Sequence, residues 1–473
     1  MKNTTYQFLL FVLLIITSST FLSCSHSKKI SSVEIAAALP ALQPSQINIP
    51  IKIYAKPFFE KAETMAPPEF TSGGWPAYLQ TGCDFKYKYR FVRSGFLFNV
   101  VNNKVIITLN GNYQIAGAKC LCAFNKQASP WVMGSCGFGA EPLRKVQIVI
   151  GSQLQFNQNY SVKTITRVES LKAIDQCSVT LFNQNVTPEV LDSIRASVVS
   201  FTQSMDSTIT GFDFSETINE AAKKVGKKVS LKNYGYMKVN PASLSLSPLN
   251  YAKDTLYVTV GAGCYPEITS DSVNTSVTTF LPPLKTEKLV PGFTINANAA
   301  YNYIFLDTLI NQTLYNKIFI ISGKKVIINN VDITGLENGR ISMKVNFSGS
   351  KKGTLFLDGT PILNVEKQLI SIPDLDYSLK SKDVALNVGK SLFNGKIVHT
   401  LREKASINVA EIYQKNRLKM DSSLTRTVST GINTIGKTSD LKITGLVIKK
   451  DFVLIQARVK GELSVLVGKL DMK

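Results

Sequence analysis

The sequence predicts an α+β fold: long, curved antiparallel sheets wrapped around amphipathic helices, in two tandem modules of an elongated molecule. Three observations predict it. Several segments alternate apolar and polar residues with a period of two, as a strand with one buried face does. Two other stretches carry apolar residues every three or four positions, as amphipathic helices do. The order of these segments is similar in the two halves of the chain, which indicates an internal repeat.

The first 23 residues predict a lipoprotein signal peptide. A single cation, Lys2, precedes an apolar run at 8–16, which is too short to remain as a membrane-spanning helix. The motif Phe21-Leu22-Ser23-Cys24 resembles a bacterial lipobox, in which the Cys24 thiol receives acyl chains such as palmitate. An ordinary secretory peptide with an incidental cysteine is the alternative. We expect membrane attachment through this lipid, at the outer membrane and facing the periplasm, because no acidic run follows Cys24.

The mature chain is strongly basic. The sequence has 54 Lys and Arg against 33 Asp and Glu, a net charge of +21 spread over both halves. Such a field suits anionic envelope components such as lipid headgroups, although solubility alone also explains it. Nucleic acid is not an expected partner, because the charge forms no concentrated patch and the chain is exported.

Six cysteines remain after Cys24, and an even number in an oxidising compartment predicts disulfides. They are Cys83, Cys120, Cys122, Cys136, Cys177 and Cys264. We expect Cys120 and Cys122 to have different partners, with the Gly-rich loop that holds Cys136 as one of them. A metal site built on Cys120, Cys122 and Cys136 is disfavoured, because paired C-x-x-C spacing and a nearby His are both missing.

Strands are clearest at 83–91, where aromatic and charged residues alternate strictly, and at 341–347 and 453–459. Helices are predicted at 188–225, with Thr187 as N-cap and a break at Gly211, and at 391–435.

Each half opens with a short strand (46–54 and 294–300) and a short helix, and each closes with a hairpin after its helical stretch. We therefore divide the chain into a signal peptide (1–23), a tether (24–44), a first module (45–285) with all six remaining cysteines, and a second module (290–473).

Catalytic and cofactor sites are not predicted. The one His outside the tether, His399, lies in a helical stretch without a catalytic setting. Residues 431–438 satisfy the P-loop formula, but a helix is expected before the loop and a strand after it, the reverse of the order that phosphate binding needs. Acidic residues such as Asp84, Asp213, Glu216, Asp374 and Asp376 show no spacing that marks a catalytic pair.

An apolar groove is the remaining candidate site, because a curved sheet around an amphipathic helix can leave a slot for acyl chains. The two helical stripes supply its expected lining: Val190, Ile194, Val198, Phe201 and Met205 from the first, and Phe393, Ile397, Leu401, Leu424 and Val428 from the second.

The chain also resembles the bacterial lipoproteins of the domain of unknown function 4403 family. The resemblance lies in the lipobox, in residues 45–51, in the strand after Cys83 and in residues 236–241. That family is similar to the tubular lipid-binding superfamily, which includes the bactericidal permeability-increasing (BPI) proteins; the resemblance implies an apolar-ligand groove and no catalytic residues.

We therefore expect a non-enzymatic envelope protein that binds or transfers lipids or other amphiphiles. A structural or interaction lipoprotein with solid cores is the alternative, and an enzyme acting on envelope glycans or lipids is a third possibility.

Overall fold

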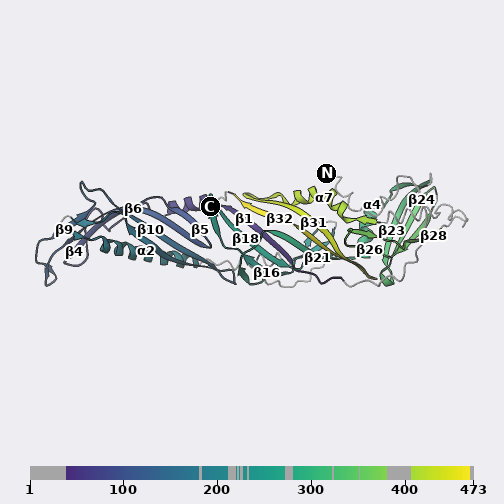
Figure 1. Cartoon of the computed structure of the whole chain (residues 1–473), viewed down its shortest axis with the longest axis horizontal. Coiled ribbons are helices and arrows are strands. Elements are labelled where there is room, and N and C mark those ends of the chain that lie inside the picture. Colours follow the sequence, from purple (N-terminus) through teal and green to yellow (C-terminus); the bar gives the residue numbers. More distant parts are fainter. Residues whose placement is uncertain are drawn as a thin grey trace.

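The computed structural model describes residues 39–468 apart from positions 66, 180–183, 211–219, 221–222, 224–226, 232–233, 272–280, 322–323, 351 and 381–405. The predicted signal peptide, Cys24 and most of the tether lie outside these residues. The molecule is a long, sheet-rich rod with one sheet at each end and a larger sheet between them (Figure 1).

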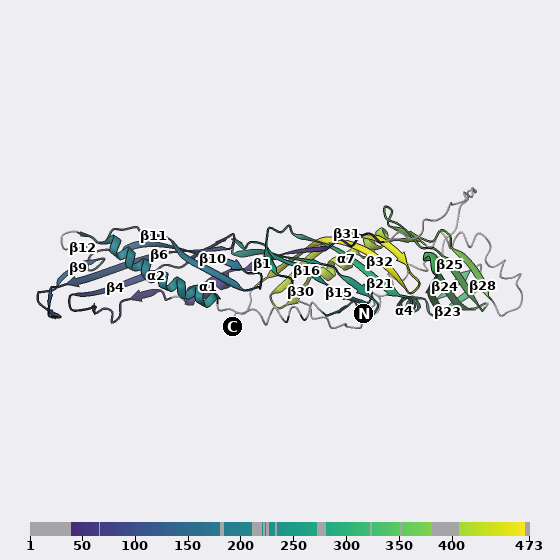
Figure 2. The ribbon, with the colours of Figure 1, turned by 90° about the horizontal axis from the view of Figure 1, so that it is seen from below.

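The first end sheet has the order β11-β10-β6-β4-β2. Its strands are β2 (Glu69–Thr71), β4 (Phe85–Arg93), β6 (Lys104–Lys119), β10 (Arg144–Phe156) and β11 (Val162–Ala173). Strand β4 confirms the strand predicted from alternation at 83–91. Helix α2 (Thr187–Thr210) packs along β11 (Figure 2) and begins at the predicted start, while the predicted break at Gly211 lies outside the described residues.

The second end sheet has the order β22-β23-β24-β25-β28. Its strands are β22 (Ile318–Ile321), β23 (Lys324–Gly335), β24 (Ile341–Gly349), β25 (Gly353–Gly359) and β28 (Asp376–Lys380), and β24 confirms the strand predicted at 341–347. Helix α4 (Tyr303–Leu314) packs on β23, and the Asn302 side chain caps its first turn by accepting a hydrogen bond from the Phe305 amide.

The central sheet joins segments that are far apart in the sequence. Its long strands are β1 (Ser45–Tyr54), β16 (Pro241–Leu246), β18 (Thr255–Cys264), β21 (Gly292–Asn302), β31 (Ile432–Ile448) and β32 (Phe452–Val467). Strand β1 pairs antiparallel with β18 and parallel with β32, and β21 pairs antiparallel with β32. The opening strand of each half therefore lies beside the closing hairpin of that half.

Shorter elements complete the described fold. They are α1 (Lys56–Met65), β3 (Leu79–Gln80), β5 (Leu97–Val101), β7 (Cys122–Ala123), β8 (Lys126–Gln127), β9 (Val132–Cys136), β12 (Ser178–Val179), β13 (Gln184–Asn185), β14 (Val229–Ser230), β15 (Tyr236–Lys238), β17 (Asn250–Ala252), β19 (Glu267–Thr269), β20 (Leu284–Thr286), the 3₁₀ turn η2 (Glu337–Gly339), β26 (Ile362–Asn364), β27 (Leu369–Ser371) and β29 (Ser406–Asn408). Within the described ranges, no helix is long and apolar enough to cross a membrane.

The second predicted helical stretch is wrong at its C-terminal end. Helix α7 (Val409–Leu424) stops well before residue 435, and β30 (Arg426–Ser429) follows it. Val428 lies in β30 and Ile432 in β31, so the spacing of four residues that predicted a helix joins two different strands across a turn. Gly431, with φ of 77°, makes the turn between β30 and β31.

Candidate functional site

The central sheet carries a continuous row of aliphatic side chains. Alternate residues of β1 are Ile47, Ile49, Ile51 and Ile53, and the register places them opposite Ala262, Val260, Val258 and Leu256 of β18. Directly opposed side chains on one face of an antiparallel pair lie in contact distance. We call these eight residues the central apolar face.

The central apolar face is only partly covered. All of its side chains have intermediate exposure, whereas the end sheets hold compact cores centred on fully buried residues such as Val146 and Val331. Among the residues that the structure describes, neither of these two cores includes a side chain of β1 or β18. Much of the aliphatic surface in the middle of the rod is therefore not sealed as a core would be.

The same kind of surface continues into the second half. Ile295 of β21 lies opposite Val459 of β32, which in turn lies opposite Leu441 of β31, and all three are half-buried. The next row, Ala297, Ala457 and Ile443, has the same exposure class. The apolar strip thus spans strands from both halves of the chain.

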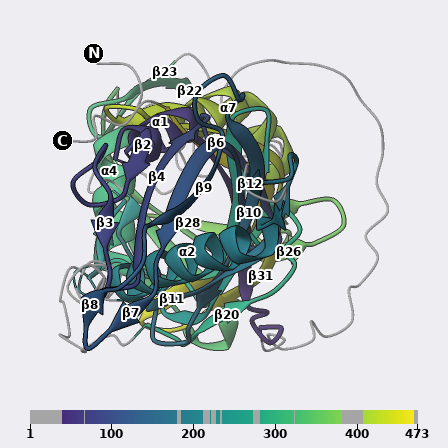
Figure 3. The ribbon, with the colours of Figure 1, turned by 90° about the vertical axis from the view of Figure 1, so that its left-hand side faces the viewer.

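The opposite side of the central sheet is polar. Gln46 and Asn48 of β1 line a shallow cleft of about 340 Å³ together with Lys460 and Glu462 of β32. Glu462 forms an ion pair with Lys437 at 3.3 Å, and the Asn48 amide donates to the Val290 carbonyl at 2.9 Å. The central sheet therefore has one apolar face and one mainly polar face, on which Thr259 and Gln456 are nevertheless buried; Figure 3 looks along the rod from the end that holds the first end sheet.

The apolar residues along α2 pack into the core of the first end sheet. Within the described structure they line no open groove. Val190 is 6% exposed, and Ile194 and Val198 pack against the same cluster. Phe201 lies off the buried stripe and is 57% exposed, because Thr202, at 2% exposure, takes the inward position at that turn. Met205 lies in the same helix, but its side chain is not among those described.

The second stripe is not assembled as expected either. Phe393, Ile397 and Leu401 lie outside the described residues. Leu424 is half-buried at the end of α7, while Val428 is 57% exposed on β30. Helix α7 instead buries Val409, Ile412 and Tyr413.

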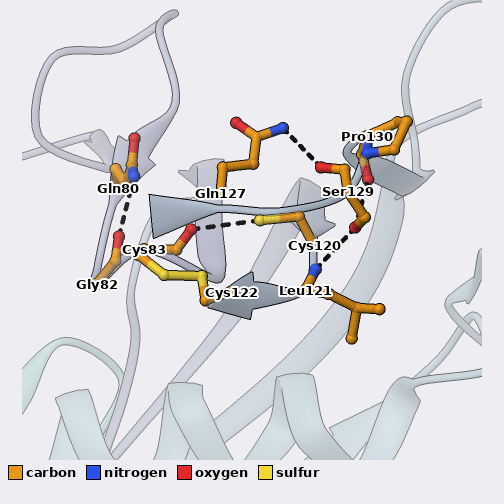
Figure 4. The surroundings of a disulfide bond; sticks show 9 residues. All are labelled: Gln80, Gly82, Cys83, Cys120, Leu121, Cys122, Gln127, Ser129 and Pro130. Carbon is orange, nitrogen blue, oxygen red and sulfur yellow. Dashed lines mark hydrogen bonds between the residues drawn. A yellow bond between two sulfur atoms is a disulfide. The ribbon is translucent and has the colours of Figure 1, made fainter. Parts of the chain in front are cut away.

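Two disulfides form, Cys83–Cys122 and Cys136–Cys177. The expectation that the Cys136 loop pairs with Cys120 or Cys122 is wrong, because Cys136 faces Cys177 in the first-end core. Cys120 and Cys264 are free, buried thiols. The Cys120 thiol donates to the Cys83 carbonyl at 3.3 Å (Figure 4), and burial raises the pKa of Cys264 despite a hydrogen bond with Ser45.

Two half-buried acidic groups, Asp206 and Asp374, serve as structural ties. Burial alone would raise the pKa of Asp206, but hydrogen bonds from Thr166 and Thr164 outweigh it and lower that pKa. At Asp374 burial also opposes ionisation, and bonds from Thr360 together with the Arg340 guanidinium lower the pKa. Each carboxylate is occupied by its own partners.

The described residues give little support to a nucleotide, catalytic or metal site. The P-loop formula at 431–438 lies in the turn and first residues of the β30–β31 hairpin, so a strand enters it where a helix was expected, and no helix leaves it. His399, Asp213 and Glu216 lie outside the described residues. Within the described ranges, no group of three or more His, Cys, Asp or Glu side chains is placed to hold a metal ion.

Comparison with known proteins gives a family and several distant structures, including the following two. The model of the family described as "Domain of unknown function (DUF4403)" matches residues 43–467. No curated protein matches the sequence. Among solved structures, a lipopolysaccharide binding protein is 9% identical with a TM-score of 0.22, covering 89% of this chain and 98% of its own. P47 of Clostridium botulinum E1 is 10% identical with a TM-score of 0.20, covering 89% and 99%. TM-scores this low establish neither fold nor function.

Proposed function

Because the chain belongs to the DUF4403 family, whose description states no activity, we propose its function from the geometry of the central apolar face. We propose that this is a lipid-anchored envelope protein that binds or transfers lipids or other amphiphiles without catalysing a reaction. Each methylene that leaves water contributes about 0.8 kcal/mol, so an acyl chain along this face needs few polar contacts. The partial exposure of eight matched aliphatic side chains is the observation that carries the proposal.

We also propose two tandem modules, 45–285 and 290–473. The order of elements supports this division. Each module opens with a strand and a helix, β1 and α1 or β21 and α4, and closes with a hairpin whose last strand pairs antiparallel with the opening strand. The apolar strip lies where the two modules share one sheet.

The predicted lipid anchor on Cys24 is compatible with this arrangement of the two modules. The Gln456 side chain of β32 donates to the Pro40 carbonyl at 3.0 Å, and the Asn296 side chain of β21 donates to the Pro44 carbonyl at 3.3 Å. The last residues of the predicted tether therefore pack on the central sheet. An acyl anchor on Cys24 would hold the middle of the rod near the membrane that supplies its ligand.

The alternative is a structural or interaction lipoprotein with closed cores. The packing of Val190, Ile194 and Val198 into the first-end core favours it, since these residues were the expected groove lining. The two proposals differ in the middle of the rod, where one requires an accessible apolar surface and the other does not.

Occlusion of the central apolar face tests the proposal. Val258→Trp would fill space beside Ile51, and Tyr257→Trp is the matched control, because Tyr257 is the adjacent residue of β18, faces the other side and is 38% exposed. We expect Val258→Trp to weaken binding of a fluorescent fatty acid at least about tenfold, a change of about 1.4 kcal/mol, and Tyr257→Trp to leave it unchanged. Equal binding by both variants, each shown to be folded by circular dichroism, would contradict ligand binding at this face.

A further inference from the structure

One end of the rod carries a small cluster of exposed apolar side chains. Residues 120–133 form the β7–β8 hairpin and run into β9, at the end of the first end sheet (Figure 1, Figure 3). We call this segment the apical hairpin. Phe124 at its turn is 101% exposed and Leu121 is 73% exposed, while Val132 and Met133 are 55% and 54% exposed. A concentration of apolar surface on one protrusion indicates a contact site.

Folding of the hairpin does not explain the identity of residue 124. Phe124 and Asn125 have φ of 50° and 59°, the left-handed pair that a two-residue hairpin turn requires and that favours Asn and Gly. A bulky residue at positive φ is unfavourable, and the Phe124 ring gains no packing in return because it is fully exposed. An aromatic ring at this point is useful only for contact with something outside the chain.

The hairpin presents these side chains on a fixed scaffold. The disulfide between Cys122 and Cys83 ties it to the bend that precedes β4. The Ala128 amide donates to the Leu121 carbonyl at 2.7 Å, and the Leu121 amide donates to the Ser129 hydroxyl at 2.8 Å. The protruding side chains therefore need little further ordering when they make a contact.

The surroundings of the apical hairpin are mainly cationic and aromatic, and Asp84 also lies beside it, with its carbonyl accepting a hydrogen bond from the Cys120 amide at 3.0 Å. Lys119 and Lys126 are exposed, and no Asp or Glu occurs between residues 118 and 140. Behind the hairpin, the Lys86 ammonium lies 4.3 Å from the centre of the Trp131 ring. The Lys88 ammonium lies 4.8 Å from the Tyr78 ring. Trp, Tyr and Lys beside an apolar tip are the side chains that suit the headgroup region of a bilayer.

We propose that the apical hairpin inserts Leu121 and Phe124 into the surface of an anionic lipid bilayer, with Lys119 and Lys126 among the headgroups. A bilayer fits better than a protein partner, because the protruding cluster is far smaller than the 20 to 30 residues a side of a typical stable protein interface. The lysines, with no acidic residue in this segment, select negative charge. This contact is separate from the central apolar face and does not depend on ligand binding there.

The test uses the mature chain with Cys24→Ser, which removes the acylation site, and vesicles of phosphatidylethanolamine with phosphatidylglycerol. The two Trp residues of the sequence, Trp75 and Trp131, both lie in the first end sheet region, so the shift of their emission and its quenching by brominated lipid report insertion. Phe124→Asn keeps a residue that suits the turn and removes the ring. Leu418→Ser, on the 83% exposed Leu418 of α7, is the control for loss of an exposed apolar residue elsewhere.

We expect the Cys24→Ser chain to bind these vesicles, and the added Leu121→Ser and Phe124→Asn substitutions to weaken binding at least about tenfold. Lys119→Gln with Lys126→Gln should remove the preference over phosphatidylcholine vesicles, and Leu418→Ser should change nothing. Absence of vesicle binding by the Cys24→Ser chain would overturn the proposal, as would equal binding by the Leu121→Ser, Phe124→Asn variant. Fatty-acid binding should be unchanged in that variant, so failure here is distinguishable from failure of the proposed function.

Discussion

Ile49 of β1 lies directly opposite Val260 of β18, although 211 positions separate them, and both side chains are half-buried. The pair sits in the middle of a row of such contacts, between two end sheets with closed cores. This contrast within one molecule links the fold to the proposed function.

Two Val→Ala variants measure the difference in packing between an end core and the central apolar face. Val331 is 0% exposed in the second-end core, whereas Val258 belongs to the central apolar face. We expect Val331→Ala to lower the free energy of unfolding by about 2–3 kcal/mol, because it leaves a cavity in a closed core. Val258→Ala should lower the free energy of unfolding by about 1 kcal/mol or less, because the Val258 side chain buries less apolar area on folding than Val331 does. Urea unfolding of both variants checks this, and equal costs would mean that the central face is packed.

Asp206 ties α2 to β11, and its loss should be visible in the pH dependence of stability. Its carboxylate accepts hydrogen bonds from the Thr164 hydroxyl at 2.7 Å and from the Thr166 amide at 2.8 Å. Because the folded-state pKa is lowered, the stabilisation is present above the unfolded pKa of about 3.9 and is lost as the pH falls through the folded value.

Asp206→Asn should therefore reduce the free energy of unfolding by about 1–2 kcal/mol at neutral pH, and the difference from the unsubstituted chain should shrink as the pH falls through the lowered folded-state pKa. Urea titrations over a series of pH values measure it. A difference that stays constant with pH would show that the carboxylate charge is not what stabilises the contact.

The buried disulfide between Cys136 and Cys177 should add more to the free energy of unfolding than the entropy of closing one loop alone would give. Cys136 and Cys177 are both 0% exposed and 41 residues apart, and the Cys177 amide donates to the Thr187 hydroxyl at the start of α2. Replacing both with Ala should cost about 4 kcal/mol from loop closure, in addition to a cavity. Replacing Cys83 and Cys122 with Ser should cost less, because Cys122 lies on an exposed hairpin. The melting temperatures of the two double variants should differ in that order.

The free thiols give a direct check of the cysteine assignment. Cys120 is 5% exposed and Cys264 is 1% exposed. In the unacylated Cys24→Ser chain, a thiol reagent should label neither residue in the folded state and both after denaturation without reductant. Labelling of no thiol after denaturation would indicate a third disulfide in the oxidised protein.

Local patterns in the sequence predicted local elements well. Strict alternation identified β4 and β24, and the Thr187-Pro188 pair identified the start of α2. The end of α7 was missed because the four-residue spacing of Val428 and Ile432 imitates a helix, although a hairpin turn separates the two residues. The disulfide partners could not be derived, since pairing depends on which strands become neighbours in space.

The sequence predicted the candidate groove on helices, whereas the proposal made from the structure rests on the strands of the central apolar face. The helical stripes were predicted to line the groove because they are long. In the structure, Val190, Ile194 and Val198 pack into the core of the first end sheet. The four alternating isoleucines of β1 were visible in the sequence as a strand. Their importance depends on pairing with β18, about two hundred residues later, and on what remains uncovered after folding.

Native mass spectrometry of the unacylated Cys24→Ser chain, purified without detergent, tests the central claim most directly. We predict a population with the added mass of one or more acyl compounds, released on denaturation and reduced by Val258→Trp but not by Tyr257→Trp. A single ligand-free mass for the folded chain, which also fails to take up added fatty acid or phospholipid, would contradict an accessible apolar site in the central sheet.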